Sequence, residues 1–71
     1  MNILTFESIH AVLSADKLLN QHQLPFEIVP TPRAISSDCG TSIRISPEIS
    51  EKAVALIQSE GITVELHVPE S

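Results

Sequence analysis

Two segments of the chain repeat apolar residues every three or four positions, which predicts two amphipathic helices. The first follows Ser8, whose hydroxyl can accept a hydrogen bond from the first helical turn. The second begins at Ser46-Pro47-Glu48, where a capping hydroxyl precedes a proline suited to the first helical position, and it ends at Gly61. The two apolar faces consist of Ala11, Val12, Ala15, Leu18 and Leu19, and of Ile49, Ala53, Leu56 and Ile57.

Four shorter segments have the alternation or the apolar run typical of strands, namely residues 3–6, 26–29, 41–45 and 62–68. Pro30 and Pro32 are expected to end the second strand, because proline lacks the N–H that a sheet ladder needs. In the third strand Ile43 and Ile45 share one face, while Ser42 and Arg44 share the other.

The order strand, helix, strand, strand, helix, strand predicts one α+β domain spanning residues 1–71. We expect the ferredoxin-like βαββαβ arrangement, in which two helices cover one face of a four-stranded antiparallel sheet. The other face of the sheet would be polar and open. Ile9 and Leu13 lie at the edge of the first helix's apolar stripe, as peripheral core or as part of a partner surface.

Charge and composition exclude several classes of function. Nine acidic residues against four basic ones give a net charge of −5, and the basic residues are spread along the chain. We therefore expect no nucleic-acid partner, because phosphate binding needs clustered Lys and Arg. No apolar run approaches the roughly 18 residues that span a membrane, and the N-terminus lacks the basic region of a secretory signal. The three histidines show no zinc spacing, and we expect no cofactor. A single cysteine fits a reducing compartment, so we expect a cytoplasmic protein.

The segment from Pro30 to Gly40, PTPRAISSDCG, is long for a connection between paired strands, which usually takes two to five residues. It holds the chain's one cysteine, Cys39. Long ordered loops of compact domains often carry function, so Cys39 is the candidate reactive residue.

The residues around Cys39 are expected to have opposite effects on the stability of its thiolate. Gly40 permits a left-handed turn and close approach to the sulfur. A thiolate could be stabilised by Arg33 and by the hydroxyls of Ser36, Ser37, Thr41 and Ser42. Asp38 would disfavour it, so the sequence leaves the balance open. The alternative is that Cys39 is a small buried apolar residue, as cysteines outside disulfides often are.

Several cysteine mechanisms do not fit. A dithiol–disulfide cycle within one chain needs a second cysteine. Four residues separate Cys39 from Arg44, whereas a tyrosine-phosphatase loop needs five. None of the histidines is placed near the loop by the sequence, as a cysteine–histidine pair would require. The mechanism that remains is a carrier, which accepts a sulfur or selenium atom, holds it as a persulfide or selenopersulfide, and releases it.

From residue 3 to 68 the chain resembles the selenium/sulfur (Se/S) carrier protein-like family, small bacterial domains of unknown function. The resemblance rests on SIHAVLSADKLL in the first helix and on IVPTPRAISSDCGTSIRI, and its most specific part is Pro32, Arg33, Ser36, Ser37, Cys39 and Gly40. It implies that Cys39 carries the sulfur, that Arg33 and Gly40 shape its site, and that Ser36 and Ser37 contribute to binding.

The resemblance further implies protein partners, a cysteine desulfurase and small sulfur-transfer proteins typified by TusA. Such a carrier need not be a stand-alone enzyme. The exposed sheet face and edge strands also permit a homodimer. The rival hypothesis is a non-catalytic binding or regulatory module in which Cys39 is structural and residues 30–40 form a recognition loop.

Overall fold

The computed structural model describes residues 1–35 and 39–68. Its elements are β1 (Asn2–Phe6), α1 (Ile9–Gln21), β2 (Glu27–Pro30), β3 (Thr41–Ile45), α2 (Pro47–Ser59) and β4 (Val64–His67). The predicted order of strands and helices is confirmed, and the third strand has the predicted bounds. The fourth strand is shorter than predicted.

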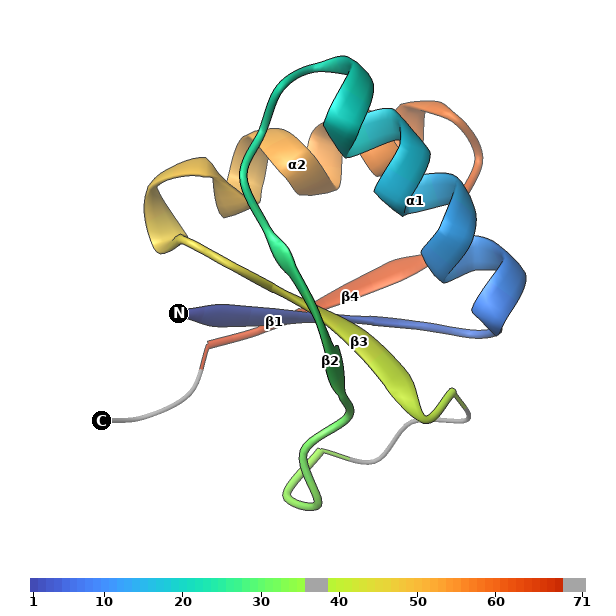
Figure 1. The fold of residues 1–71 in the computed structure, drawn as a ribbon, viewed down its shortest axis with the longest axis vertical. Helices are drawn as coiled ribbons and strands as arrows, with labels where there is room; N and C mark the ends of the chain where they lie inside the picture. The colour runs from blue at the N-terminus through green and yellow to red at the C-terminus, as the bar shows by residue number, and fades with distance from the viewer. Residues whose placement is uncertain (36–38, 69–71) are drawn as a thin grey trace.

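The sheet has the order β2-β3-β1-β4, and each of its neighbouring pairs is antiparallel. Figure 1 shows both helices on the same side of the sheet, with β2 along one edge. This is the predicted α+β ferredoxin-like arrangement.

Pro30 belongs to β2 rather than ending the strand before it. The Thr31 N–H donates to the Gly40 carbonyl at 2.9 Å, so the N–H groups of alternate residues along β2 face β3. Pro30 occupies one of the intervening positions, where its nitrogen faces the open edge of the sheet. No ladder hydrogen bond is lost there.

The helices end in the same way with different residues. After α2 the Gly61 N–H donates to the Gln58 carbonyl and the Ile62 N–H to the Ile57 carbonyl, with Gly61 at φ 78° as predicted. After α1 the residue at the left-handed position is Gln23, at φ 57°. At the N-termini the Ser8 hydroxyl caps α1 by accepting from the Ala11 N–H at 3.3 Å, whereas the Ser46 side chain makes no capping bond.

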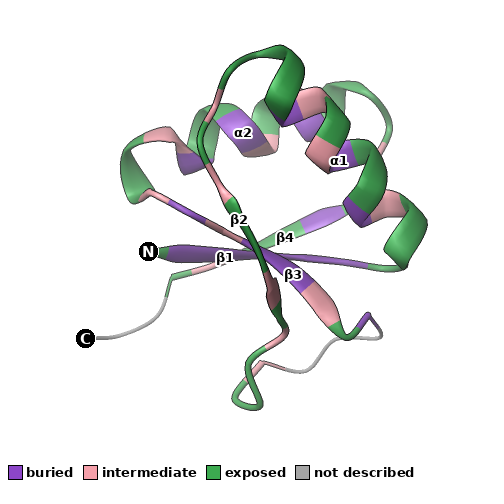
Figure 2. Cartoon of the chain, in the orientation of Figure 1, coloured by how far each residue is buried: buried purple, intermediate pink, exposed green. Residues whose placement is uncertain are grey.

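The core lies between the helices and the sheet face that they cover. The apolar strand residues of this face with no exposed surface are Leu4, Ile43 and Ile45. They pack with fully or almost fully buried residues of the helices, namely Val12, Ala15, Leu19, Ala53 and Ile57. In Figure 2 the buried residues of α1 and α2 lie on their sheet-facing sides, and β1 is buried along its length.

The opposite sheet face is less open than the sequence predicted. Ile3, Thr5 and Ser42 alternate with core residues, so they belong to this outer face, yet each is buried. Pro32, Ala34 and Ile35 of the loop after β2 line a hollow of about 570 Å³ together with Ile3 and His67. The expectation of a fully open face is therefore wrong, because the long loop folds back toward β1 and β4.

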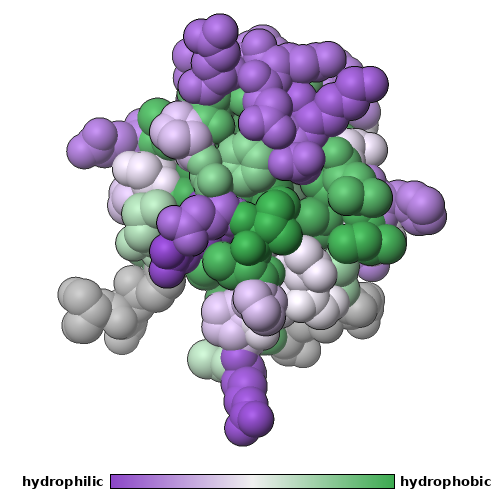
Figure 3. All heavy atoms as spheres, viewed as in Figure 1, coloured by the Kyte–Doolittle hydropathy of each residue, from purple (hydrophilic) through white to green (hydrophobic). Residues whose placement is uncertain are grey.

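Ile9 and Leu13 are 47% and 56% exposed, so they are not peripheral core. In Figure 3 apolar surface lies over α1 and in the middle of the face that the figure shows. Hydrophilic residues gather around the turn that follows α1. In the described part of the chain, no helix has the length and apolar character needed to cross a membrane.

Candidate functional site: the Cys39 thiol

Cys39 lies at the edge of the core rather than in an accessible turn. It precedes β3 by two residues, and Thr41, Ile43 and Ile45 of that strand face the helices. Cys39 continues this alternation and is 6% exposed, within the same cluster of buried side chains as Phe6 and Val12. Of the two predictions for Cys39, the structure therefore confirms the small buried residue, and the accessible thiol that a carrier needs is not what it shows.

The strand register explains where along the core this thiol lies. β1 and β3 are antiparallel, with Leu4 opposite Ile43 and Asn2 opposite Ile45. The beginning of β3 consequently lies beside the end of β1, where the chain turns into α1. Cys39 thus belongs to the end of the core that holds Phe6, near the rim of the sheet.

The backbone around Cys39 is held by Thr31, on the other side of the loop. The Thr31 N–H donates to the Gly40 carbonyl at 2.9 Å, and the Thr31 hydroxyl donates to the Cys39 carbonyl at 2.9 Å. The same hydroxyl is hydrogen-bonded to the Ser42 hydroxyl. Because a hydroxyl has one hydrogen, and that of Thr31 goes to Cys39, the Ser42 hydroxyl is the donor to Thr31.

Thr31 was missed as a site residue by the sequence analysis, and Ser42 was considered only as one of several hydroxyl donors near the thiol. Ser42 was placed correctly on the outer face, but its complete burial was not foreseen. The available signal was the strand alternation. When the alternation of the two strands is continued after Val29 and before Thr41, Thr31 and Ser42 lie on one face of the sheet and Cys39 on the other.

Gly40 is exposed and does not adopt the left-handed conformation that the sequence suggested. Among the described residues, Gly61 is the glycine with positive φ. A Cβ built on Gly40 would meet no atom of the described residues within 4 Å. Neither backbone conformation nor close packing therefore requires glycine at this position.

Arg33 is exposed, and no hydrogen bond or ion pair between described residues involves it. Among the described residues, Arg44 forms an ion pair with Glu27 at 2.8 Å, and His67 Nε2 lies 3.6 Å from a carboxylate oxygen of Glu65. Ser36 and Ser37, together with Asp38, lie outside the described residues. The predicted roles of Arg33, Ser36 and Ser37 stay predictions.

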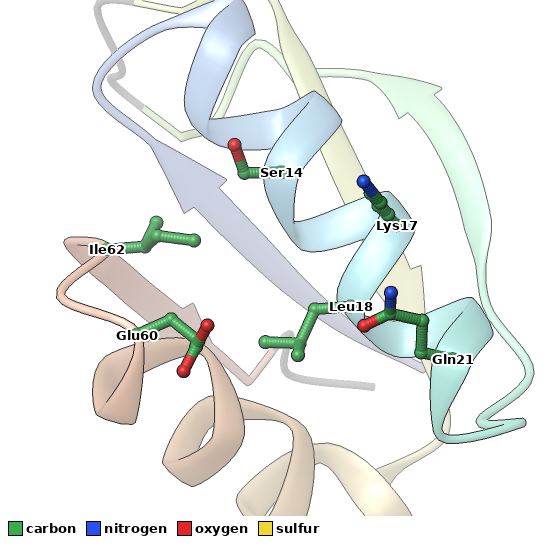
Figure 4. A pocket seen from close by; sticks show the side chains of 6 residues that line it. All are labelled: Ser14, Lys17, Leu18, Gln21, Glu60 and Ile62. Atoms are coloured by element: carbon green, nitrogen blue, oxygen red, sulfur yellow. The ribbon is translucent and has the colours of Figure 1, made fainter.

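Other parts of the described chain offer less chemistry. No group of three or more His, Cys, Asp or Glu residues is placed to hold a metal ion in residues 1–35 and 39–68. A second hollow, of about 380 Å³, lies between α1 and the end of α2 (Figure 4). Ser14, Lys17, Leu18, Gln21, Glu60 and Ile62 line it, and none of them was predicted as a site residue.

The structure thus combines a small ferredoxin-like fold with one buried cysteine at the rim of its core. The family model described as "Putative Se/S carrier protein-like" matches residues 1–68. The chain belongs to this family. Nothing among curated proteins or solved structures matches it. The Se/S carrier-like assignment covers both helices, all four described strands and the loop that leads to Cys39.

Proposed function

We propose that this protein is a sulfur or selenium carrier and that Cys39 is the residue that holds the cargo. The proposal rests on membership of the Se/S carrier-like family in a chain with one cysteine. Within a chain that carries the atom on its own thiol, Cys39 is the sole candidate.

The transfer step is a sulfur exchange without net oxidation or reduction. The Cys39 thiolate attacks the terminal sulfur of a donor persulfide, and a new S–S bond forms to Cys39 Sγ. The S–S bond of the donor breaks, and its thiolate leaves with the electron pair. Release repeats the step in reverse, when an acceptor thiolate attacks the outer sulfur held on Cys39.

Burial of Cys39 adds a requirement to this function. A side chain that is 6% exposed cannot be reached in line by the persulfide of another protein. The backbone around Cys39 therefore has to move outward locally during loading and release. Cys39 lies at the rim of the core. This movement therefore leaves in place the core side chains that pack in the space between β1 and α2.

The partners we propose are those that the chemistry needs, a persulfide donor and a thiol acceptor. A cysteine desulfurase suits the first role and a small TusA-like sulfur-transfer protein the second. Such exchange requires reduced thiols, which agrees with a cytoplasmic location. We assign Arg33, Ser36, Ser37 and Gly40, which share the loop with Cys39, to contacts with the cargo or its donor.

Intact mass spectrometry tests the proposal. The protein is incubated with a cysteine desulfurase and cysteine, and a gain of one sulfur atom that dithiothreitol removes is expected. Cys39→Ala is the matched control, since alanine fits a small buried position without adding a polar group. Wild-type protein that takes up no sulfur, or Cys39→Ala protein that takes up as much, would refute the proposal.

The burial of Cys39 favours a second candidate, a binding module in which Cys39 is part of the packing. Small ferredoxin-like domains serve many functions, and the fold does not separate the two. Under this candidate, Cys39→Ala keeps partner binding and lowers the stability of the domain. Loading in the mass spectrometer separates the two candidates, because a packing cysteine acquires no sulfur.

A further inference from the structure

We infer that Thr31 is the positioning residue for Cys39, and that its hydroxyl holds the thiol in the buried state from which transfer begins. The role in sulfur transfer that this inference gives to Thr31 rests on the proposed carrier function. The hydrogen bonds from which it is argued do not depend on that function. Thr31 lies on the strand side of the loop, eight residues before Cys39. It is not part of the sulfur chemistry itself.

The contacts are concentrated on two successive peptide units. The backbone N–H of Thr31 bonds the Gly40 carbonyl, and its hydroxyl bonds the Cys39 carbonyl, so two successive carbonyls before β3 are held by one residue. Moving Cys39 Sγ outward requires the Cys39–Gly40 backbone to shift. At least the hydroxyl bond from Thr31 then breaks.

Ser42 extends this device into the sheet. Its side chain has no exposed surface, and its hydroxyl donates to Thr31. When Cys39 moves outward, the Thr31 hydroxyl loses its acceptor while it still accepts from Ser42, and a part-buried hydroxyl left without an acceptor costs free energy. The Ser42–Thr31–Cys39 chain of hydrogen bonds therefore resists opening more than a single exposed bond would.

The chain also offers a matched residue that lacks this connection. Thr5 is another threonine of the outer face, buried where Thr31 is half-buried, and its hydroxyl is hydrogen-bonded at 3.0 Å to Nε2 of His67 on β4. Thr5→Val and Thr31→Val remove the same hydroxyl and keep the same shape. A general loss of stability would affect both variants, whereas positioning of Cys39 would distinguish them.

The test is the rate at which iodoacetamide alkylates Cys39, followed by intact mass in native buffer, with global stability measured by urea unfolding. Loss of one hydrogen bond changes an opening equilibrium by about fivefold, so Thr31→Val should react about fivefold faster than wild type or more. Thr31→Ser, which keeps the hydroxyl, should return the rate to within about twofold of wild type. Thr5→Val should leave the rate near that of wild type once both are compared at equal stability.

Equal rates in Thr31→Val and wild type would overturn the inference, as would equal acceleration in Thr5→Val. Failure of Thr31→Ser to restore the slow rate would do so too, because the shape of the side chain and not its hydroxyl would then matter. The outcome is separable from the proposed function. Alkylation needs no persulfide donor, so a protein that never accepts sulfur can still show the Thr31 effect.

Discussion

The side-chain amide of Asn2 on β1 donates to the hydroxyl of Ser50 on α2 at 2.9 Å, although 48 residues separate them in the chain. Both side chains are buried, and the Ser50 hydroxyl in turn donates to the Pro47 carbonyl at 3.0 Å. This pair fixes the first turn of α2 to the beginning of β1. It is a polar connection inside an otherwise apolar layer.

Removing either partner should therefore lower stability. Ser50→Ala leaves the Asn2 amide buried without its acceptor, which costs about 1–3 kcal/mol of unfolding free energy. Asn2→Ala should cost less, because the Ser50 hydroxyl keeps its bond to Pro47. Urea unfolding of both single variants and the double variant measures this. Strictly additive losses would show that the two residues do not interact.

The helix ends offer a matched pair of substitutions. Gln23 adopts the left-handed conformation, which is unfavourable for a residue with a Cβ, so Gln23→Gly should raise stability by up to about 1 kcal/mol. Gly61→Ala should lower it by roughly 1 kcal/mol, since alanine meets the same penalty at Gly61. Thermal and urea unfolding report both changes. A loss of stability in Gln23→Gly would contradict this description of the end of α1.

Gly40→Ala should be tolerated, although Gly40 adjoins the proposed carrier residue. Its φ is not positive, and an added Cβ would lie more than 4 Å from the nearest non-adjacent atom among residues 1–35 and 39–68. The unfolding free energy should stay within about 0.5 kcal/mol of wild type, and the alkylation rate of Cys39 should stay within about twofold of the wild-type rate. A larger effect on alkylation in a stable variant would mean that Gly40 has a role at the thiol that the backbone does not reveal.

The buried and the exposed leucines of α1 should lose different amounts of unfolding free energy when they are replaced by alanine. Leu19 has no exposed surface, so Leu19→Ala should cost about 2–5 kcal/mol. Leu13 is 56% exposed, and Leu13→Ala should cost far less, within about 0.5 kcal/mol apart from helix propensity. Comparable losses in the two variants would place Leu13 in the core and remove it as part of a partner surface.

Much of the fold could be predicted from the sequence because its periodic segments are unambiguous. Ser8, Pro47 and Gly61 mark helix ends by local chemistry, and Thr41–Ile45 has the strand bounds that its alternation gives. Gln23 shows the limit of this reasoning, since a glutamine in the left-handed conformation carries no local signal. There the pattern of hydrogen bonds at the end of the helix decides.

The site was harder to predict, because loop composition says little about which way a side chain points. A polar loop with a glycine suggested an exposed thiol at Cys39. The strand alternation of β3 continues past the loop boundary and turns that side chain into the core. The contact between Thr31 and Cys39 depends on strand pairing eight residues apart, which loop composition does not specify.

Onward transfer of sulfur is the measurement that tests the carrier account most directly. Protein loaded with one sulfur atom is freed of donor and mixed with a small TusA-like acceptor, and both masses are followed with time. We predict that the extra sulfur leaves Cys39 and is recovered on the acceptor thiol in equal amount. Sulfur that never adds to Cys39, or that adds and is never passed on, would contradict the account.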